Sequence, residues 1–100
     1  MPGTDIQLDE KIKVVISEPK KWKVILLNDD STPMEFVISL LIEIFRHTHE
    51  TAADIMLQVH ETGSGIAGVY SFEIAEAKAV EATNLARTNS HPLQIKLEEE

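Results

Sequence analysis

The segment from Met34 to Phe45 is the feature that most constrains the fold of this chain. Its only polar residues, Glu35, Ser39 and Glu43, recur at every fourth position, so a helix here carries one narrow polar stripe and is apolar elsewhere. Such a helix is buried over most of its surface. The chain has 100 residues, of which 43% are hydrophobic, enough for one compact domain but too little material to surround the helix. We therefore expect part of this apolar surface to line a binding pocket.

A strand precedes this helix. The run WKVILL, residues 22–27, is rich in apolar and β-branched residues and is followed by the polar NDD of residues 28–30, which predicts a largely buried strand. Thr32, Pro33 and Glu35 then form a strong helix start, a T-x-x-E capping box with proline at the first helical position. We expect the side chain of Thr32 to cap this helix.

The remaining elements are bounded by similar signals. Thr48 is a candidate cap for a second helix that runs to about Thr62, where Gly63 supplies a left-handed stop. The order β-α-α-β-α-β predicts an α+β domain over residues 21–100, with helices packed on a three-stranded antiparallel sheet. Its later elements are a strand at GIAGVYS (65–71), a third helix from the cap Ser71 to about Arg87, a last strand at LQIKL (93–97) and the acidic end EEE (98–100) as a solvated tail.

Residues 1–20 differ in composition from the rest. They are mostly polar and contain Pro19 near their end, which indicates a flexible N-terminal extension, although the alternation in KIKVVI (residues 11–16) leaves an added edge strand open. The start of the chain carries acids where a secretory signal has a basic region and an apolar run, and no uncharged apolar stretch is long enough to span a membrane. We expect a cytoplasmic protein with no membrane partner.

Charge and cysteine usage exclude several classes of function. With 17 acidic and 9 basic residues the net charge is -8, which repels phosphate backbones, so we expect no nucleic-acid partner. The sequence has no cysteine, which excludes disulfides, thiolate metal sites and thiol nucleophiles.

Three apparent motifs fail on their context. GSGIAG (residues 63–68) has the spacing of a dinucleotide-binding turn, but here a helix precedes it and a strand follows, the reverse of what that site needs. HETAA at residue 49 and HETGS at residue 60 lack the second histidine of a zinc-protease helix. NDDSTPMEF (residues 28–36) has proline where a calcium loop needs glycine. We expect no metal site and no cofactor.

The polar cluster Asn28, Asp29 and Asp30 has two possible interpretations. Taken alone, these residues form a turn and help the helix to start. However, they lie beside a helix with surplus apolar surface, and Met56, Val59 and His60 share one face of the second predicted helix. Together these features predict an apolar pocket with a polar rim.

A ligand that joins a cation to a bulky apolar group satisfies both halves of such a pocket, and the free N-terminus of a polypeptide is one. Its ammonium can donate to the side-chain oxygen of Asn28 and to a neutral ring nitrogen of His60, with Asp29 and Asp30 supplying negative potential. Met34, Val37 and Met56 can enclose the side chain, and methionines adapt to several ligand shapes.

Two other classes of function stay open on the residues alone. One is a small metal-dependent or acid/base hydrolase built on Asp29, Asp30 and His60. The other is a purely structural interaction domain that uses its acidic surface.

Four segments together resemble the ClpS family. They are WKVILLNDDSTPMEFV, the M-x-x-V-H of Met56 to His60, GVYSFEIAEAK and HPLQIKLE, and the resemblance covers about residues 22–98. ClpS proteins are non-enzymatic adaptors that deliver substrates with destabilising N-terminal residues to the ATP-driven unfoldase of the Clp protease. The resemblance implies a three-stranded sheet with three helices, similar to the C-terminal domain of the ribosomal stalk protein.

The resemblance also implies roles for individual residues. Asn28, Asp29 and His60 would hold the substrate α-amino group, and Asp30 would bind near the peptide backbone. Met34 would act as a gate against β-branched first residues. The implied side-chain pocket consists of Thr32, Met34, Val37, Met56, Val59 and Leu93.

The implied partners are an unfoldase and its substrates. The N-terminal domain of a ClpA-like AAA+ unfoldase would bind the third helix at Glu73, Glu76 and Lys78. Substrates would begin with Leu, Phe, Tyr or Trp, and the N-terminal extension would be required for their delivery.

Overall fold

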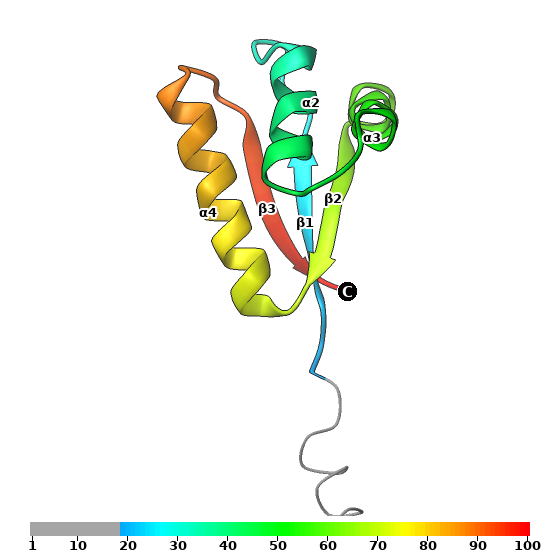
Figure 1. Ribbon diagram of the computed structural model, residues 1–100, viewed down its shortest axis with the longest axis vertical. Helices are drawn as coiled ribbons and strands as arrows, with labels where there is room; N and C mark the ends of the chain where they lie inside the picture. The colour runs from blue at the N-terminus through cyan, green and yellow to red at the C-terminus, as the bar shows by residue number, and fades with distance from the viewer. Residues whose placement is uncertain (1–18) are drawn as a thin grey trace, which may run out of the picture.

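The computed structural model describes residues 19–100, so the predicted strand at 11–16 and nearly all of the predicted extension at 1–20 lie outside the described residues. The described chain confirms the predicted order β-α-α-β-α-β (Figure 1). Its elements are β1 (Trp22–Leu27), α2 (Met34–Glu43), α3 (His49–Thr62), β2 (Ser64–Tyr70), α4 (Phe72–Thr88) and β3 (Gln94–Glu99).

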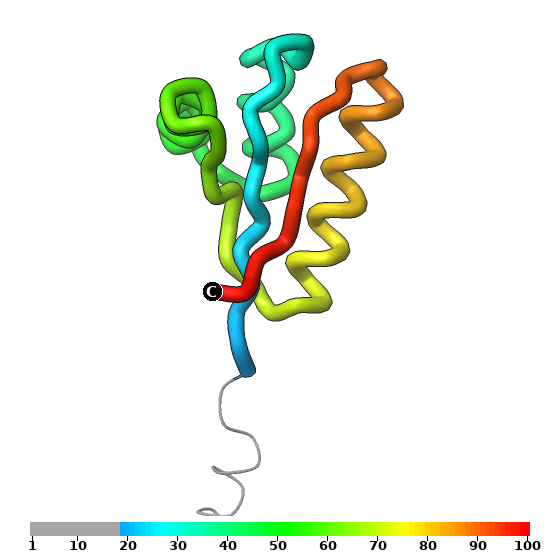
Figure 2. Tube along the Cα trace, turned by 180° about the vertical axis from the view of Figure 1, so that it is seen from behind, coloured from blue at the N-terminus to red at the C-terminus, as the bar shows by residue number. Residues whose placement is uncertain are grey.

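The sheet has three antiparallel strands in the order β2-β1-β3. The three helices of residues 19–100 cover one face of it, and no helix of this range lies on the other face, as the view from behind shows (Figure 2). The central strand is the most buried, because Val24, Ile25 and Leu26 are 0%, 7% and 0% exposed. The predicted buried strand at 22–27 is therefore confirmed, with the same bounds.

Helix α2 and the turn that follows it contain the apolar segment at 34–45. Val37, Leu40 and Leu41 are buried in the core, and Ile44 and Phe45 remain buried in the turn after the helix ends at Glu43. No helix within residues 19–100 combines the length and apolar character needed to cross a bilayer.

The predicted cap of α2 by Thr32 is wrong. Pro33 occupies the N-cap position, and no side chain caps the helix. The hydroxyl of Thr32 instead donates to Oδ2 of Asp29 at 2.6 Å. The helix begins one residue later than predicted, so Thr32 lies one position before the N-cap, and its hydroxyl is a donor to a charged acceptor instead of an acceptor for a helix N–H.

The ends of α3 follow the sequence prediction. Thr48 Oγ1 accepts a hydrogen bond from the backbone N–H of Thr51 at 3.1 Å. At the other end, Gly63 adopts φ 92°, the left-handed conformation that glycine tolerates best, and its N–H bonds to the carbonyl of Val59. Ser71 stands at the N-cap position of α4 as expected, although its side chain makes no capping bond.

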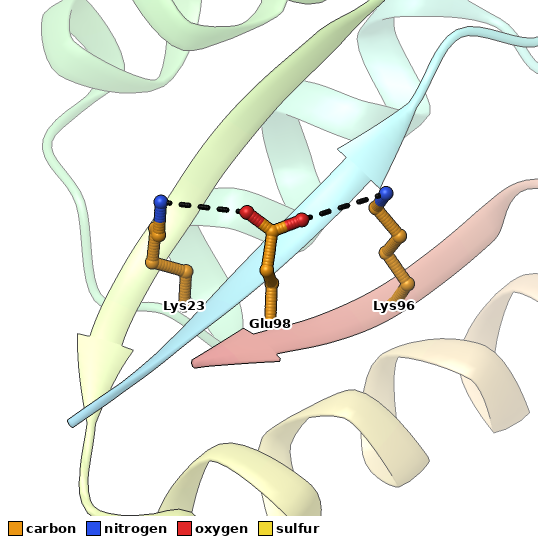
Figure 3. Close-up of polar contacts among 3 residues, drawn as sticks. All are labelled: Lys23, Lys96 and Glu98. Carbon is orange, nitrogen blue, oxygen red and sulfur yellow. Dashed lines mark ion pairs between the residues drawn. The ribbon is translucent and has the colours of Figure 1, made fainter. Parts of the chain in front are cut away.

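The prediction that the C-terminal acidic end is a solvated tail is wrong. The acidic end is not a free tail, because β3 continues through Glu99 and pairs with β1. The carboxylate of Glu98 lies between the ammonium groups of Lys23 on β1 and Lys96 on β3, at 3.6 and 3.7 Å (Figure 3). Each such exposed pair contributes at most about 1 kcal/mol, and together they favour the strand register in which Lys23 faces Glu98.

The GSGIAG segment has a structural explanation. Gly63 ends α3, and Gly65 lies where β2 passes directly against that helix, since a Cβ at Gly65 would stand 2.7 Å from Cγ2 of Val59 and 3.3 Å from the carbonyl oxygen of Ile55. The second glycine therefore permits a close approach between a strand and a helix.

We predict that Gly65→Ala lowers the free energy of unfolding by about 1–3 kcal/mol, because the added methyl group overpacks the contact between β2 and α3. Chemical denaturation followed by circular dichroism measures this change. Ser64→Ala, on the neighbouring half-buried residue, is the matched control and should change stability by less than about 0.5 kcal/mol. Equal stability of the two variants would contradict the proposed close approach.

Candidate functional site

A cavity of about 200 Å³ opens where β1, α2 and α3 meet. Two segments form it: the loop from residue 28 to residue 33, which links β1 to α2, and the last turns of α3. The backbone N–H of Asn28 donates to the carbonyl of Gly63 at 2.9 Å, and this bond fixes the start of the loop against the end of α3. The lining residues are Asn28, Asp29, Asp30, Thr32, Met34, Met56 and His60.

The carboxylate of Asp29 is held in place by Thr32. The Thr32 hydroxyl donates to Oδ2 of Asp29 at 2.6 Å, and the Thr32 backbone N–H donates to the Asp29 carbonyl at 3.3 Å. Thr32 is itself 7% exposed and is the buried polar residue of the described chain. A buried hydroxyl bonded to a carboxylate restricts the rotation of both groups, so Asp29 presents its other oxygen in a defined direction.

Both polar and apolar side chains line the cavity. Asn28, Asp29, Asp30 and His60 supply an amide, two carboxylates and an imidazole, whereas two methionines supply the apolar wall. Met56 is 5% exposed and lies deep, while Met34 is 45% exposed.

The size of this cavity limits its occupant. It is somewhat larger than an engineered cavity of about 150 Å³ that binds benzene. It is smaller than the roughly 300–1,000 Å³ typical of pockets for drug-sized ligands. It therefore matches one amino-acid side chain together with the polar group attached to it.

Three predicted pocket residues do not line this cavity. Val37, Val59 and Leu93 are 2%, 1% and 1% exposed and belong to the hydrophobic core. Val59 packs toward Gly65 of β2, which explains why Met56 and His60, one turn apart on α3, reach the cavity while Val59 does not. The helical spacing in the sequence predicted Met56, Val59 and His60 on one face of the helix. It did not indicate that Val59 points toward β2 while the other two point toward the cavity.

The residues predicted on α4 lie at the opposite end of the molecule. Trp22 at the start of β1 pairs with Tyr70 at the end of β2, and α4 begins directly after it, whereas the cavity lies beyond the other end of β1 (Figure 1). Glu73 and Glu76 are exposed in the first turns of α4.

Lys78 differs from these two glutamates because its ammonium is engaged within the chain. Its Nζ donates to the carbonyl of Ile44 at 2.7 Å, at the end of α2, and lies 5.3 Å from the centre of the Tyr70 ring. Burial raises the pKa of Tyr70 above its usual value. Lys78 thus joins α4 to the C-terminal end of α2, an interaction that the sequence did not indicate.

The described residues hold no cluster suited to a metal ion. Within residues 19–100 no three His, Asp or Glu side chains lie close enough together to ligate one. The carboxylate of Asp29 accepts a hydrogen bond from Thr32 instead.

Known proteins similar to this chain fall in one family. The family model described as ATP-dependent Clp protease adaptor protein ClpS matches residues 17–96. The ClpS adapter protein of Hyphomonas neptunium is 44% identical over 98 residues, which are 98% of this chain and 83% of that protein. The ClpS adapter protein of Bdellovibrio bacteriovorus is 52% identical over 85 residues, which are 85% of this chain and 75% of that protein.

A solved structure is similar over most of the chain. Agrobacterium tumefaciens ClpS2 bound to L-phenylalaninamide matches with a TM-score of 0.80 and 43% sequence identity, over 83% of this chain and 100% of that chain. This similarity agrees with the three-stranded sheet and three helices described above.

Proposed function

The chain belongs to the ClpS family, the adaptor proteins of the ATP-dependent Clp protease, and from this premise we propose that its cavity binds the N-terminal residue of protein substrates. It holds the free α-amino group and the bulky hydrophobic first side chain, and the adaptor then delivers the substrate to the Clp AAA+ unfoldase. The observation that carries this proposal is the cavity of about 200 Å³ that is lined by both carboxylates and methionines. L-phenylalaninamide, the ligand of the related ClpS2 structure, likewise joins a free amine to an apolar ring.

Recognition of the α-amino group falls to the polar residues of the cavity. The ammonium donates to the side-chain oxygen of Asn28 and to a neutral ring nitrogen of His60, while Asp29 and Asp30 supply negative potential. Asp30 also accepts a hydrogen bond near the peptide backbone. Each charge-assisted hydrogen bond contributes roughly 1.5–3 kcal/mol, which makes the charged amine a requirement for binding.

Recognition of the first side chain falls to the apolar residues. Leu, Phe, Tyr and Trp bury enough apolar surface here to contribute roughly 1.5–3 kcal/mol. Met34, exposed beside the cavity, acts as the gate against β-branched first residues. Thr32 and Met56 form the wall. Val37, Val59 and Leu93 lie behind them in the core and contact the larger side chains when the flexible methionines move aside.

The proposed role is recognition without catalysis. The similar proteins are named adaptors, and binding of an amino terminus accounts for the amide, carboxylates and imidazole without a reaction step. The net charge of -8 makes nucleic acid and anionic membranes unfavourable partners, and we place the adaptor in the cytoplasm with its protease.

We predict that a labelled peptide beginning with Phe binds with a Kd of about micromolar order, and that its N-acetylated twin binds at least about 100-fold more weakly, because acetylation removes the ammonium. Fluorescence anisotropy measures both. Asp29→Asn, which keeps an acceptor for Thr32 but removes the charge, and His60→Ala should each weaken binding of the free amine.

Gln58→Ala is the matched control for this experiment, because Gln58 is exposed on the same helix but does not line the cavity. Equal affinity for the two peptides, or the absence of binding to either, would refute recognition of the amino terminus.

We predict a positioning role for the Thr32 hydroxyl. Thr32→Val removes the hydrogen bond to Asp29 while conserving shape, and it should weaken binding of the free-amine peptide by about threefold to tenfold. Thr32→Ser retains the hydroxyl and should bind as the wild type does. Thermal unfolding of both variants separates this effect from loss of folding. A Thr32→Val variant with undiminished affinity would show that the orientation of Asp29 does not matter.

Delivery requires a second surface, and we propose that α4 supplies it. Glu73 and Glu76 contact the N-terminal domain of a ClpA-like unfoldase, and Lys78 contributes from a position where it also holds the end of α2. The extension at 1–20 takes part in delivery. Because α4 begins at the end of the molecule away from the cavity, the adaptor can hold substrate and unfoldase together (Figure 1).

We predict that the double variant Glu73→Lys with Glu76→Lys loses binding to the unfoldase N-terminal domain by about tenfold or more, since it reverses two exposed charges. Calorimetric titration with that domain measures the loss. The affinity of the same variant for a Phe-first peptide should stay within about twofold of wild type. If unfoldase binding is unchanged, α4 is not the docking surface.

A further inference from the structure

A second cavity of about 490 Å³ lies beside the first and has no part in the function proposed so far. It is formed where α4 ends and β3 begins, at the same end of the molecule as the loop from residue 28 to residue 33 (Figure 1). Ser31 of that loop faces this second cavity, while its neighbours Asp30 and Thr32 line the first. The lining residues are Ser31, Arg87, Ser90, His91, Pro92 and Gln94.

Arg87 gives this second cavity a charge opposite to that of the first. None of the residues that line it is acidic, although the chain as a whole carries a net charge of -8. Among residues 19–100, Arg87 takes part in none of the ion pairs. The first cavity attracts a cation, and the second offers a guanidinium that has no acidic partner in the described chain.

The guanidinium of Arg87 is already fixed in position. Its Nη1 donates to the carbonyl of His91 at 2.9 Å and to the carbonyl of Leu93 at 2.8 Å. The N–H groups on Nε and Nη2 remain, and together they form a fork that matches the two oxygens of a carboxylate. A guanidinium held by the backbone loses little side-chain freedom when it binds a ligand.

His91 is held as well. Its ring packs edge-on against Phe36 of α2, with 4.5 Å between ring centres and 64° between ring planes. The turn that carries it is also defined, because Ser90 adopts φ 62° and its N–H bonds to the Arg87 carbonyl at 3.0 Å. The His91 ring and the backbone turn at Ser90 are therefore held in defined positions in the wall of the second cavity.

The spacing between the two cavities sets which part of a substrate reaches the second. Gln94 pairs with Leu27 across β1 and β3, and Leu27 directly precedes Asn28 of the first cavity. From the α3 side to the β3 side the distance is two strand spacings, about 10 Å. An extended peptide advances about 3.3–3.6 Å per residue, so the fourth residue of a bound substrate lies about 10 Å from the first, over the second cavity, and the third lies about 7 Å along, from where a long side chain reaches it.

We propose that this second cavity is a subsite for an acidic side chain, Asp or Glu, at the third or fourth residue of the substrate, with Arg87 as its binding residue. This inference rests on the function proposed for the first cavity. It adds a preference beyond the first residue. The first cavity binds the amine and the apolar first side chain, and the second cavity binds a carboxylate about 10 Å further along the chain.

The test compares labelled peptides that differ in one side chain. Longer peptides that begin with Phe-Ala-Ala-Glu or Phe-Ala-Ala-Gln probe the fourth residue. Those that begin with Phe-Ala-Glu-Ala or Phe-Ala-Gln-Ala probe the third. In fluorescence anisotropy the Glu peptide of at least one pair should bind about threefold to fivefold more tightly than its Gln twin, as expected for an exposed ion pair with a fixed arginine. Raising the salt concentration should reduce this preference.

Two kinds of variant separate recognition from folding. Arg87→Gln should abolish the preference for Glu over Gln peptides. Because this change also removes the bonds to two carbonyls, Ser90→Asp provides a second test: aspartate tolerates the left-handed conformation at Ser90 and adds a repelling carboxylate to the cavity wall. Ser90→Asn, equal in size and neutral, is its control and should keep the preference.

The outcomes distinguish this inference from the proposed function. If Glu and Gln peptides bind the wild type equally well, the acidic subsite is refuted while recognition of the first residue stands. The same holds if the Glu preference persists in both Arg87→Gln and Ser90→Asp. If none of these Phe-first peptides binds, the function proposed for the first cavity fails, and the subsite fails with it.

Discussion

The hydrogen bond from the N–H of Asn28 to the carbonyl of Gly63 is the contact on which the site depends. The last rung of the β1–β2 ladder pairs Leu27 with Ser64, and this bond extends the ladder by one position on each strand, into the loop and the helix end. It joins the polar loop after the central strand to the last turn of α3, so Asn28 and His60 line one cavity. The bond needs the left-handed turn at Gly63, because only that turn leads the chain from α3 directly into β2.

Much of the fold could be predicted because local signals and the hydrophobic pattern agree. WKVILL is a buried central strand, Thr48 caps α3 and Gly63 ends it, as the sequence indicates. The failures share a cause, which is that local patterns do not fix the residue at which an element begins or ends. Helix α2 begins one residue later than predicted, with Pro33 at the N-cap, so Thr32 does not cap it and its hydroxyl donates to Asp29 instead. Similarly, β3 continues through Glu99, so the acidic end pairs with β1 although its side chains remain exposed.

The candidate site was predictable where its residues lie at the bounds of predicted elements. The loop residues Asn28, Asp29, Asp30 and Thr32 and the pair Met56 and His60, one helical turn apart, gather in one cavity. Other contacts between distant residues carried no such signal. The bond from Lys78 to Ile44 spans 34 positions, and the cavity beside Arg87 depends on how the end of α4 packs near the loop after β1. Such contacts follow from the packing of the elements, which single-sequence patterns do not contain.

The polar and apolar residues of the first cavity differ in rigidity, and this difference suits the function that we propose for it. Thr32 and the loop backbone hold Asp29 in one orientation, and under this proposal the ammonium that every substrate shares binds beside it. The methionines line the same cavity, and under the proposal they contact the first side chain, where substrates differ, because unbranched side chains adapt to rings and branched chains alike. A carboxylate free to rotate would lose affinity for all substrates, whereas a rigid apolar wall would accept only one of them. Under the proposed function, selectivity for the amino terminus and tolerance among bulky first residues therefore come from different residues of a single cavity.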